Sequence, residues 1–299
     1  MVVAAAHAAS GRTALFGVVP TSLVPPQRFF APFIDPNHAG TALAMLLPAP
    51  LATALDPRAP AGARLGWAAC TLVALGVIVW VGSSGAVLAA VVAAGLVAWR
   101  TAWIPRPATA ALGVAGIVAA LPWLWFADAG AGATFHERIA TWRGALATLP
   151  GFWLAGSGGG TFQRAIQPHI DTFVLWGHAH HDPLEWVLEH GLIGVVALCA
   201  AIVWAAWPDG LRSAPVSPSS RHPTAMASLP PEDDPTQTGE RGSARWVRRA
   251  DVLTISVIAV LVHSWVDFPL QIPALAMAAA ALWGLRRTAF AGRVEVAPT

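Results

Sequence analysis

The chain has 299 residues, of which 56% are hydrophobic and 11% charged, and its mean hydropathy is +0.57. Soluble globular domains carry roughly 25% charged residues, so this composition excludes an ordinary soluble protein. The formal net charge is only +2, and the basic residues, all of them Arg, are spread between apolar stretches and form no basic face for a nucleic acid. Composition therefore predicts an all-α polytopic membrane protein.

The N-terminal segment, residues 1–38, is expected to form a lead-in and a loop outside the cytoplasm. It has no charged region of the kind that begins a secretory signal, and its first apolar run is interrupted by His7, Ser10 and Arg12. The remnant of a span and a mobile lead-in are both compatible with this pattern.

Seven later stretches resemble transmembrane helices, which need about 20 predominantly apolar residues. They are 39–55, 65–81, 84–99, 108–126, 191–207, 251–266 and 272–285. We therefore expect about seven transmembrane helices, with four in 39–126, one in 191–207 and two in 251–287. Cys70 and Cys199 lie in such stretches, and we expect both to belong to packed cores.

The arginines predict which loops face the cytoplasm. When the spans are counted, most arginines fall on one side of the membrane, and the positive-inside rule makes that side cytoplasmic. These residues are Arg58, Arg64, Arg100, Arg106, Arg212, Arg221, Arg241, Arg245, Arg248, Arg249, Arg286, Arg287 and Arg293. Residues 127–190, before the fifth span, then form an insert on the opposite side. Residues 208–250 are rich in Pro, Ser and acidic residues, which predicts a disordered cytoplasmic loop, and 288–299 form a cytoplasmic tail.

The insert 127–190 carries a predicted helix and a glycine-rich segment. The stretch HERIATWRGALATL has apolar residues at helical spacing and includes Arg138 and Arg143. The segment GSGGGTF at 156–162 is compatible with a flexible turn and with a backbone nest for an anion, but it lacks the Gly-Lys-Ser/Thr ending of a P-loop.

The most polar stretch of the insert is GHAHHDPLEWVLEHGLIG at 177–194. His178, His180 and Asp182 have the H-x-H-x-D spacing of a metallohydrolase, but Pro183 occupies the position of the next ligand. Further ligands would have to come from other loops, with His263 and Asp267 as the nearest candidates. Since a histidine can accept a proton from a hydroxyl at neutral pH, a general base is the second interpretation. Interfacial histidines that only solvate a helix end are the third.

Several stretches together resemble one family of membrane enzymes. His180-His181, nine further residues and then Gly191-Leu192-Ile193-Gly194 resemble the H-[N/S/Q]-x9-G-x-x-G motif of bacterial O-antigen ligases. The superfamily also includes O-antigen polymerases and protein O-oligosaccharyltransferases. The other similar stretches are FIDPNHAG at 33–40, RIATWRGAL at 138–146, GSGGGTF at 156–162 and HSWVDFPLQIP at 263–273.

The resemblance implies a metal-independent, cofactor-free glycosyltransferase of the bacterial inner membrane, with its active site facing the periplasm. The donor would be a glycan on undecaprenyl diphosphate, and the acceptor lipid A-core or a growing polysaccharide. His180 would be the catalytic base, and Arg143, or Arg138 as its competitor, would bind the diphosphate. Arg164, His178, His181 and Asp182 would complete the substrate-binding residues.

Two positions depart from the family pattern. The family usually has Ser-Arg-Gly where this chain has GSSGAV, so that Ser84 replaces an Arg that serves the diphosphate, and His181 replaces an amide or hydroxyl. Family members are generally longer, which implies an N-terminally truncated or shortened relative. The alternative function is therefore an inactive paralogue, or a non-catalytic polytopic membrane protein in polysaccharide export.

Overall fold

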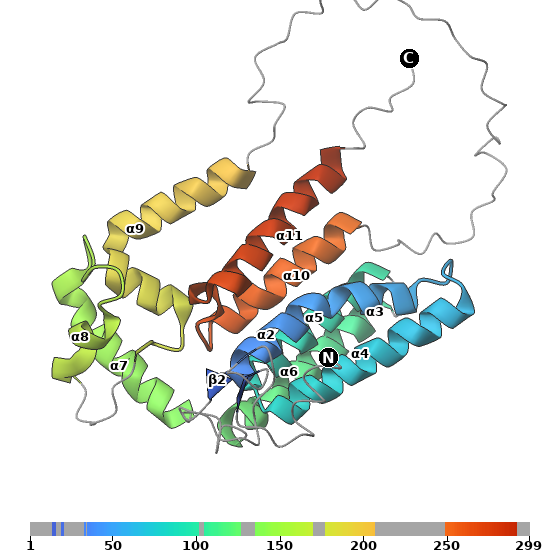
Figure 1. The fold of residues 1–299 in the computed structure, drawn as a ribbon, viewed down its shortest axis with the longest axis horizontal. Helices are drawn as coiled ribbons and strands as arrows, with labels where there is room; N and C mark the ends of the chain where they lie inside the picture. The colour runs from blue at the N-terminus through green and yellow to red at the C-terminus, as the bar shows by residue number, and fades with distance from the viewer. Residues whose placement is uncertain are drawn as a thin grey trace, which may run out of the picture.

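The computed structural model describes residues 14–15, 19–20, 33, 35–101, 105–126, 135–169, 177–206 and 249–291 (Figure 1). The predicted lead-in (apart from the short pieces just given), almost all of the predicted cytoplasmic loop at 208–250 and most of the tail at 288–299 lie outside these residues.

The described residues are almost entirely helical, which confirms the helical fold class. Two short strands, β1 (Ala14–Leu15) and β2 (Val19–Pro20), pair antiparallel. The helices are α2 (Pro36–Leu46), α3 (Pro48–Leu55), α4 (Ala61–Val81), α5 (Ser84–Thr101), α6 (Arg106–Phe126), α7 (Phe135–Phe152), α8 (Phe162–Ile166), η2 (Gln167–His169), α9 (Asp182–Ala206), α10 (Arg249–Ser264), η5 (Pro269–Gln271) and α11 (Pro273–Ala291).

Among the residues that the structure describes, four helical segments are long and apolar enough to cross a membrane. They are Pro36–Leu55, Ala61–Val81, Ser84–Thr101 and Asp182–Trp204, and Arg106–Ala119 and Asp251–Ser264 are shorter apolar helices. Each of the seven expected stretches overlaps a helix. The number of membrane spans, about seven, and their orientation remain predictions.

Helix α5 lies at the centre of the main bundle, against α2, α6 and α10 (Figure 1). Its buried face is made of small residues, Ala86, Ala89, Ala90 and Ala93, which allow the helix backbones to approach closely. A Cβ added at Gly40 of α2 would lie only 2.6 Å from the Ala86 Cβ. The core of this bundle is therefore formed by close helix contact more than by large side chains.

The outer surfaces of the helices remain apolar. Helix α4, for example, exposes Leu65, Trp67, Leu72 and Trp80, as a helix that faces lipid does. The expectation of core packing for the cysteines was wrong, because Cys70 and Cys199 are both exposed. In an apolar span, hydrophobicity alone does not distinguish a face toward other helices from a face toward lipid.

A smaller unit lies beside the bundle and is formed by α7, α8 and the beginning of α9 (Figure 1, green and yellow). Its core consists of Ala145, Phe162, Ile166, Ala179 and Leu188. The predicted helix of the insert is thus found in α7. Helix α9 begins at Asp182, nine residues before the start predicted for its span, and is broken at Gly191.

Candidate functional site

The site is centred on a contact between His180, in the turn before α9, and Asp267, between α10 and η5. The Nδ1 atom of His180 lies 3.0 Å from Oδ1 of Asp267. His180 has a φ of 49°, in the left-handed region, which costs a non-glycine residue on the order of 1–3 kcal/mol. Such backbone strain persists where the surroundings hold it, and it is concentrated at functional sites.

Asp267 is fully buried and carries a negative charge. Burial alone would raise the pKa of its carboxyl, but the hydrogen bond from His180 and the neighbouring His263 ring outweigh that effect and hold the pKa well below its usual range. The Nδ1 atom of His180 is therefore the donor to this carboxylate, and the lone pair of a neutral His180 ring is on Nε2.

His263 extends the group toward the bundle. Its Nε2 lies 3.6 Å from Oδ2 of Asp267, and its Nδ1 lies 2.6 Å from the Thr41 hydroxyl of α2. A Cβ at Gly85 would lie 2.4 Å from the His263 ring, so the GSSGAV segment packs directly on this histidine. The departure from the family pattern at Ser84 is therefore next to the site, where the Ser84 side chain is buried.

Two further residues hold the segment that carries Asp267. Arg138 of α7 is buried, and its Nη1 donates to the Val266 carbonyl at 2.7 Å. At the start of α9, the Asp182 amide donates to the Asp267 carbonyl at 3.2 Å, and Asp182 Oδ2 accepts from the Leu270 amide at 2.9 Å. Distant parts of the chain, from α2, α5, α7, the start of α9 and the segment after α10, thus meet around the His180–Asp267 pair.

His178 lies beside His180 but is hydrogen-bonded to a different carboxylate, that of Glu185. Its Nδ1 lies 2.9 Å from Oε1 of the buried Glu185, whose Oε2 accepts from the Ala179 amide at 2.5 Å. The ring also stacks on Phe268, which His180 contacts edge-on. The hydrogen bond with Glu185 raises the pKa of His178 against the opposing effect of burial.

The His178 pair predicts a pH-dependent contribution to stability. Because the pKa of His178 is raised on folding, the contribution is fully present below the unfolded value of about 6.5 and is lost as the pH rises through the folded value. The melting temperature of wild type should exceed that of His178→Gln most at pH 5.5 and least at pH 8.5. Scanning calorimetry of both proteins measures this difference, and a constant gap would contradict the prediction.

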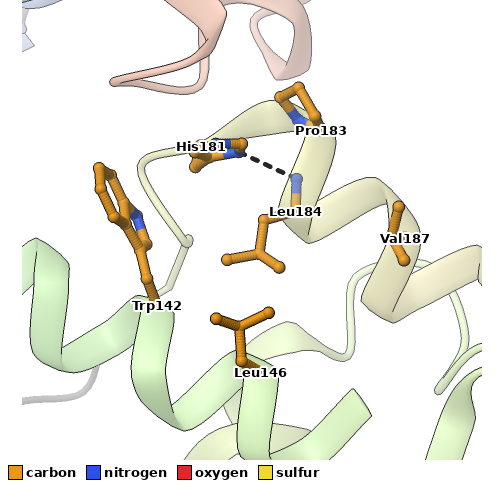
Figure 2. A pocket seen from close by; sticks show the side chains of 6 residues that line it. All are labelled: Trp142, Leu146, His181, Pro183, Leu184 and Val187. Carbon is orange, nitrogen blue, oxygen red and sulfur yellow. Dashed lines mark hydrogen bonds between the residues drawn. The ribbon is translucent and has the colours of Figure 1, made fainter. Parts of the chain in front are cut away.

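His181 points to the other side of the turn. Its ring lies between Trp142 and Trp265, with centroid distances of 5.3 and 5.2 Å, and burial lowers its pKa. Figure 2 shows its Nδ1 accepting from the Leu184 amide at 3.0 Å, so His181 caps the start of α9. It lines a cavity of about 370 Å³ with Trp142, Leu146, Pro183, Leu184 and Val187.

The two remaining arginines are placed differently from Arg138. In the described part of the chain, Arg143 of α7 and Arg164 of α8 are exposed, and neither takes part in the contacts that join His180, Asp267 and His263. Of the residues predicted from the sequence, the structure thus brings His178, His180, Asp182 and Arg138 together. The contacts of His180, Asp182 and Arg138 with the 266–267 segment were not predicted, although the HSWVDFP stretch contained the signal.

The glycine-rich segment at 156–162 is hydrogen-bonded to α9 next to the break at Gly191. The Ser157 and Gly158 amides donate to the Leu188 and Glu189 carbonyls, both at 2.9 Å. In return, the Leu192 and Ile193 amides donate to the carbonyls of the 153–154 turn at 2.8 and 3.1 Å. The Ser157 and Gly158 amides are therefore bonded to α9 and are not available to an anion. The segment fixes the position of α9.

Gly191→Ala is expected to destabilise the protein by about 2–3 kcal/mol. Gly191 has φ 60° and ψ −167°, a conformation essentially restricted to glycine, and a Cβ there would lie 2.5 Å from the Leu154 carbonyl oxygen. Thermal unfolding of the protein in nanodiscs measures the effect. The matched control is Gly95→Ala in α5, where a Cβ meets nothing within 4 Å and where we expect no loss. Equal melting temperatures for the two variants would contradict the role of Gly191.

Comparison with known proteins relates the chain to one family. The model of the family described as O-Antigen ligase matches residues 69–199, which include Ser84, Arg138, His180 and Gly191. The match confirms the resemblance to the O-antigen ligase and polymerase superfamily, and it supports a glycosyltransferase-like, multi-pass membrane protein. No curated protein and no solved structure matches the chain. No cluster of three or more residues suited to a metal ion occurs within the described ranges.

Proposed function

Because residues 69–199 relate the chain to the O-antigen ligase and polymerase superfamily, we propose that it transfers a glycan from undecaprenyl diphosphate to an acceptor hydroxyl. The acceptor is lipid A-core or a growing polysaccharide, and the reaction takes place at the periplasmic face of the inner membrane. The observation that carries the proposal is the hydrogen bond between His180 and the charged, buried Asp267.

The proposed chemistry uses His180 as the general base. Its Nε2 accepts the proton of the acceptor hydroxyl while the hydroxyl oxygen attacks the anomeric carbon of the donor glycan. The bond between that carbon and the diphosphate oxygen breaks, and undecaprenyl diphosphate leaves with the bonding electrons. Asp267 orients the His180 ring and stabilises the imidazolium that forms, as a carboxylate does for histidine bases in other enzymes. The base role needs no metal ion.

The diphosphate requires positive charge, which we assign to arginines of the α7–α8 unit. Arg143 and Arg164 are exposed and can reach a ligand in solvent or at the headgroup level. Guanidinium groups bind phosphate oxygens through paired hydrogen bonds and stabilise a diphosphate leaving group. Arg138 contributes by holding the turn at Val266, one residue before Asp267.

Reconstitution tests the proposed reaction. The protein in liposomes is supplied with undecaprenyl-diphosphate-linked glycan and either lipid A-core or a second copy of the donor, with a chelator present. We expect release of undecaprenyl diphosphate together with either glycosylated core or longer glycan, which separates a ligase from a polymerase. Failure to form either product, in a preparation that melts cooperatively, would overturn the proposal in favour of a non-catalytic protein.

A further inference from the structure

A cavity of about 820 Å³ lies between α9, α10 and η5. Most of its wall is apolar and includes Val187, Val195 and Leu198 of α9 and Leu261 of α10. Val195 and Leu198 belong to a helix long and apolar enough to cross a membrane, so this wall continues onto a surface suited to lipid. The apolar end fits a hydrocarbon chain.

Another part of the cavity lining is polar and contains an unsatisfied oxygen. Asp182, only 6% exposed, lines it, and Asp182 Oδ1 is buried without a hydrogen-bond partner. The other oxygen already accepts from the Leu270 amide. Since a buried polar atom without a partner costs about 1–3 kcal/mol, Oδ1 favours a ligand that brings a donor such as a hydroxyl.

Two tryptophans, Trp186 and Trp265, also line the cavity and provide flat surfaces. Trp186 stacks on His190 with the ring centroids 4.0 Å apart and an interplanar angle of 15°, and Trp265 lines the same cavity. Each is more than one-third exposed, so each ring has a face or edge available. Flat aromatic faces pack against the apolar C–H faces of sugar rings, while sugar hydroxyls are oriented by polar groups at the edge.

The charge of the lining indicates which substrate fits. Asp182 and Glu189 both line the cavity, and none of the described lining residues is an Arg. The cavity therefore offers no guanidinium group to bind a diphosphate, whereas a neutral, hydroxyl-rich sugar needs none. The cavity also begins beside the proposed base, because Asp182 follows His180 by two residues and its amide bonds to Asp267.

We propose that this cavity binds the acceptor, a glycan anchored by a hydrocarbon chain. One acceptor hydroxyl donates to Asp182 Oδ1, a sugar ring lies on Trp186 or Trp265, and the chain follows the apolar wall of α9 and α10. The assignment to the acceptor rests on the proposed function, but the binding of an uncharged glycolipid does not.

Photolabelling tests the binding directly. The full chain in nanodiscs is labelled with a photoreactive alkyl maltoside, an uncharged glycan on a single chain, and the labelled peptides are identified by mass spectrometry. We expect labels in 182–198 and 261–271, reduced about tenfold in Trp186→Ala and in Asp182→Asn, restored in Trp186→Phe, and unchanged in the control Trp67→Ala of α4. Excess undecaprenyl diphosphate should not displace the probe.

Values of KM measured for the acceptor and for the donor then distinguish this cavity from the donor site. Trp186→Ala should raise KM for the acceptor about tenfold and leave KM for the donor unchanged. Labelling that is equal in Trp186→Ala and wild type, or displacement of the probe by undecaprenyl diphosphate, would overturn the acceptor assignment. Transfer at the wild-type rate by His180→Ala, with the labelling pattern intact, would refute the proposed base and still support the cavity.

Discussion

The His180→Ala variant is expected to transfer glycan about 10²- to 10⁴-fold more slowly than wild type, the range that a positioned general base contributes. The Nδ1 atom of His180 is bonded to the buried carboxylate of Asp267, so its ring is oriented and Nε2 is the proton acceptor. The initial rate of undecaprenyl diphosphate release by the reconstituted protein measures the loss.

Because His180 has a positive φ, replacing it with Ala also disturbs the turn, and a second substitution is needed to separate the two effects. Asn adopts positive φ more readily than Ala, so His180→Asn preserves the turn while it removes the base. Both variants should be equally slow if the loss is chemical. His169→Ala, at an exposed position of η2, is the matched control and should retain the wild-type rate. A recovery of the rate in His180→Asn would show that the turn, and not the base, is what transfer needs.

Asp267→Asn is expected to reduce transfer by about 10²-fold or more. A neutral amide removes the charge that stabilises the imidazolium and, by donating to Nδ1, favours the wrong tautomer of His180; in a serine protease triad the corresponding change costs about 10⁴. Because Asp267 also accepts from the Phe268 amide at 3.0 Å, the melting temperature should be measured beside the rate. Asp56→Asn, in the turn before α4, is the control, with no expected loss of rate. A wild-type rate in Asp267→Asn would remove Asp267 from the mechanism.

The sequence predicted the helices and proposed one histidine as the base, because both inferences depend on local signals. Apolar length identified the stretches that contain α4 and α5, and the spacing from His180 to Gly191 singled out one histidine among several. It also placed the insert helix that became α7. These features are encoded within a few turns of chain, where periodicity and motif spacing are informative.

The partners of His180 could not be predicted, because they are set by tertiary contacts. His180 and Asp267 are 87 positions apart. The 263–267 segment was considered as a source of metal ligands and as a stretch similar to the family, but neither interpretation joins Asp267 to His180. The glycine-rich segment was similarly open to two interpretations, since nothing in GSGGGTF shows that its amides bond to α9. Likewise, composition suggested buried cysteines because it does not separate a lipid-facing surface from a packed one.

A double-mutant cycle between His180 and Asp267 tests most directly whether the two residues act as one base. Rates of undecaprenyl diphosphate release are measured for wild type, His180→Ala, Asp267→Asn and the double variant in the same liposomes. If Asp267 acts only through His180, the double variant should be no slower than His180→Ala alone. Losses that multiply in the double variant, or a wild-type rate in His180→Ala, would contradict the His180–Asp267 mechanism.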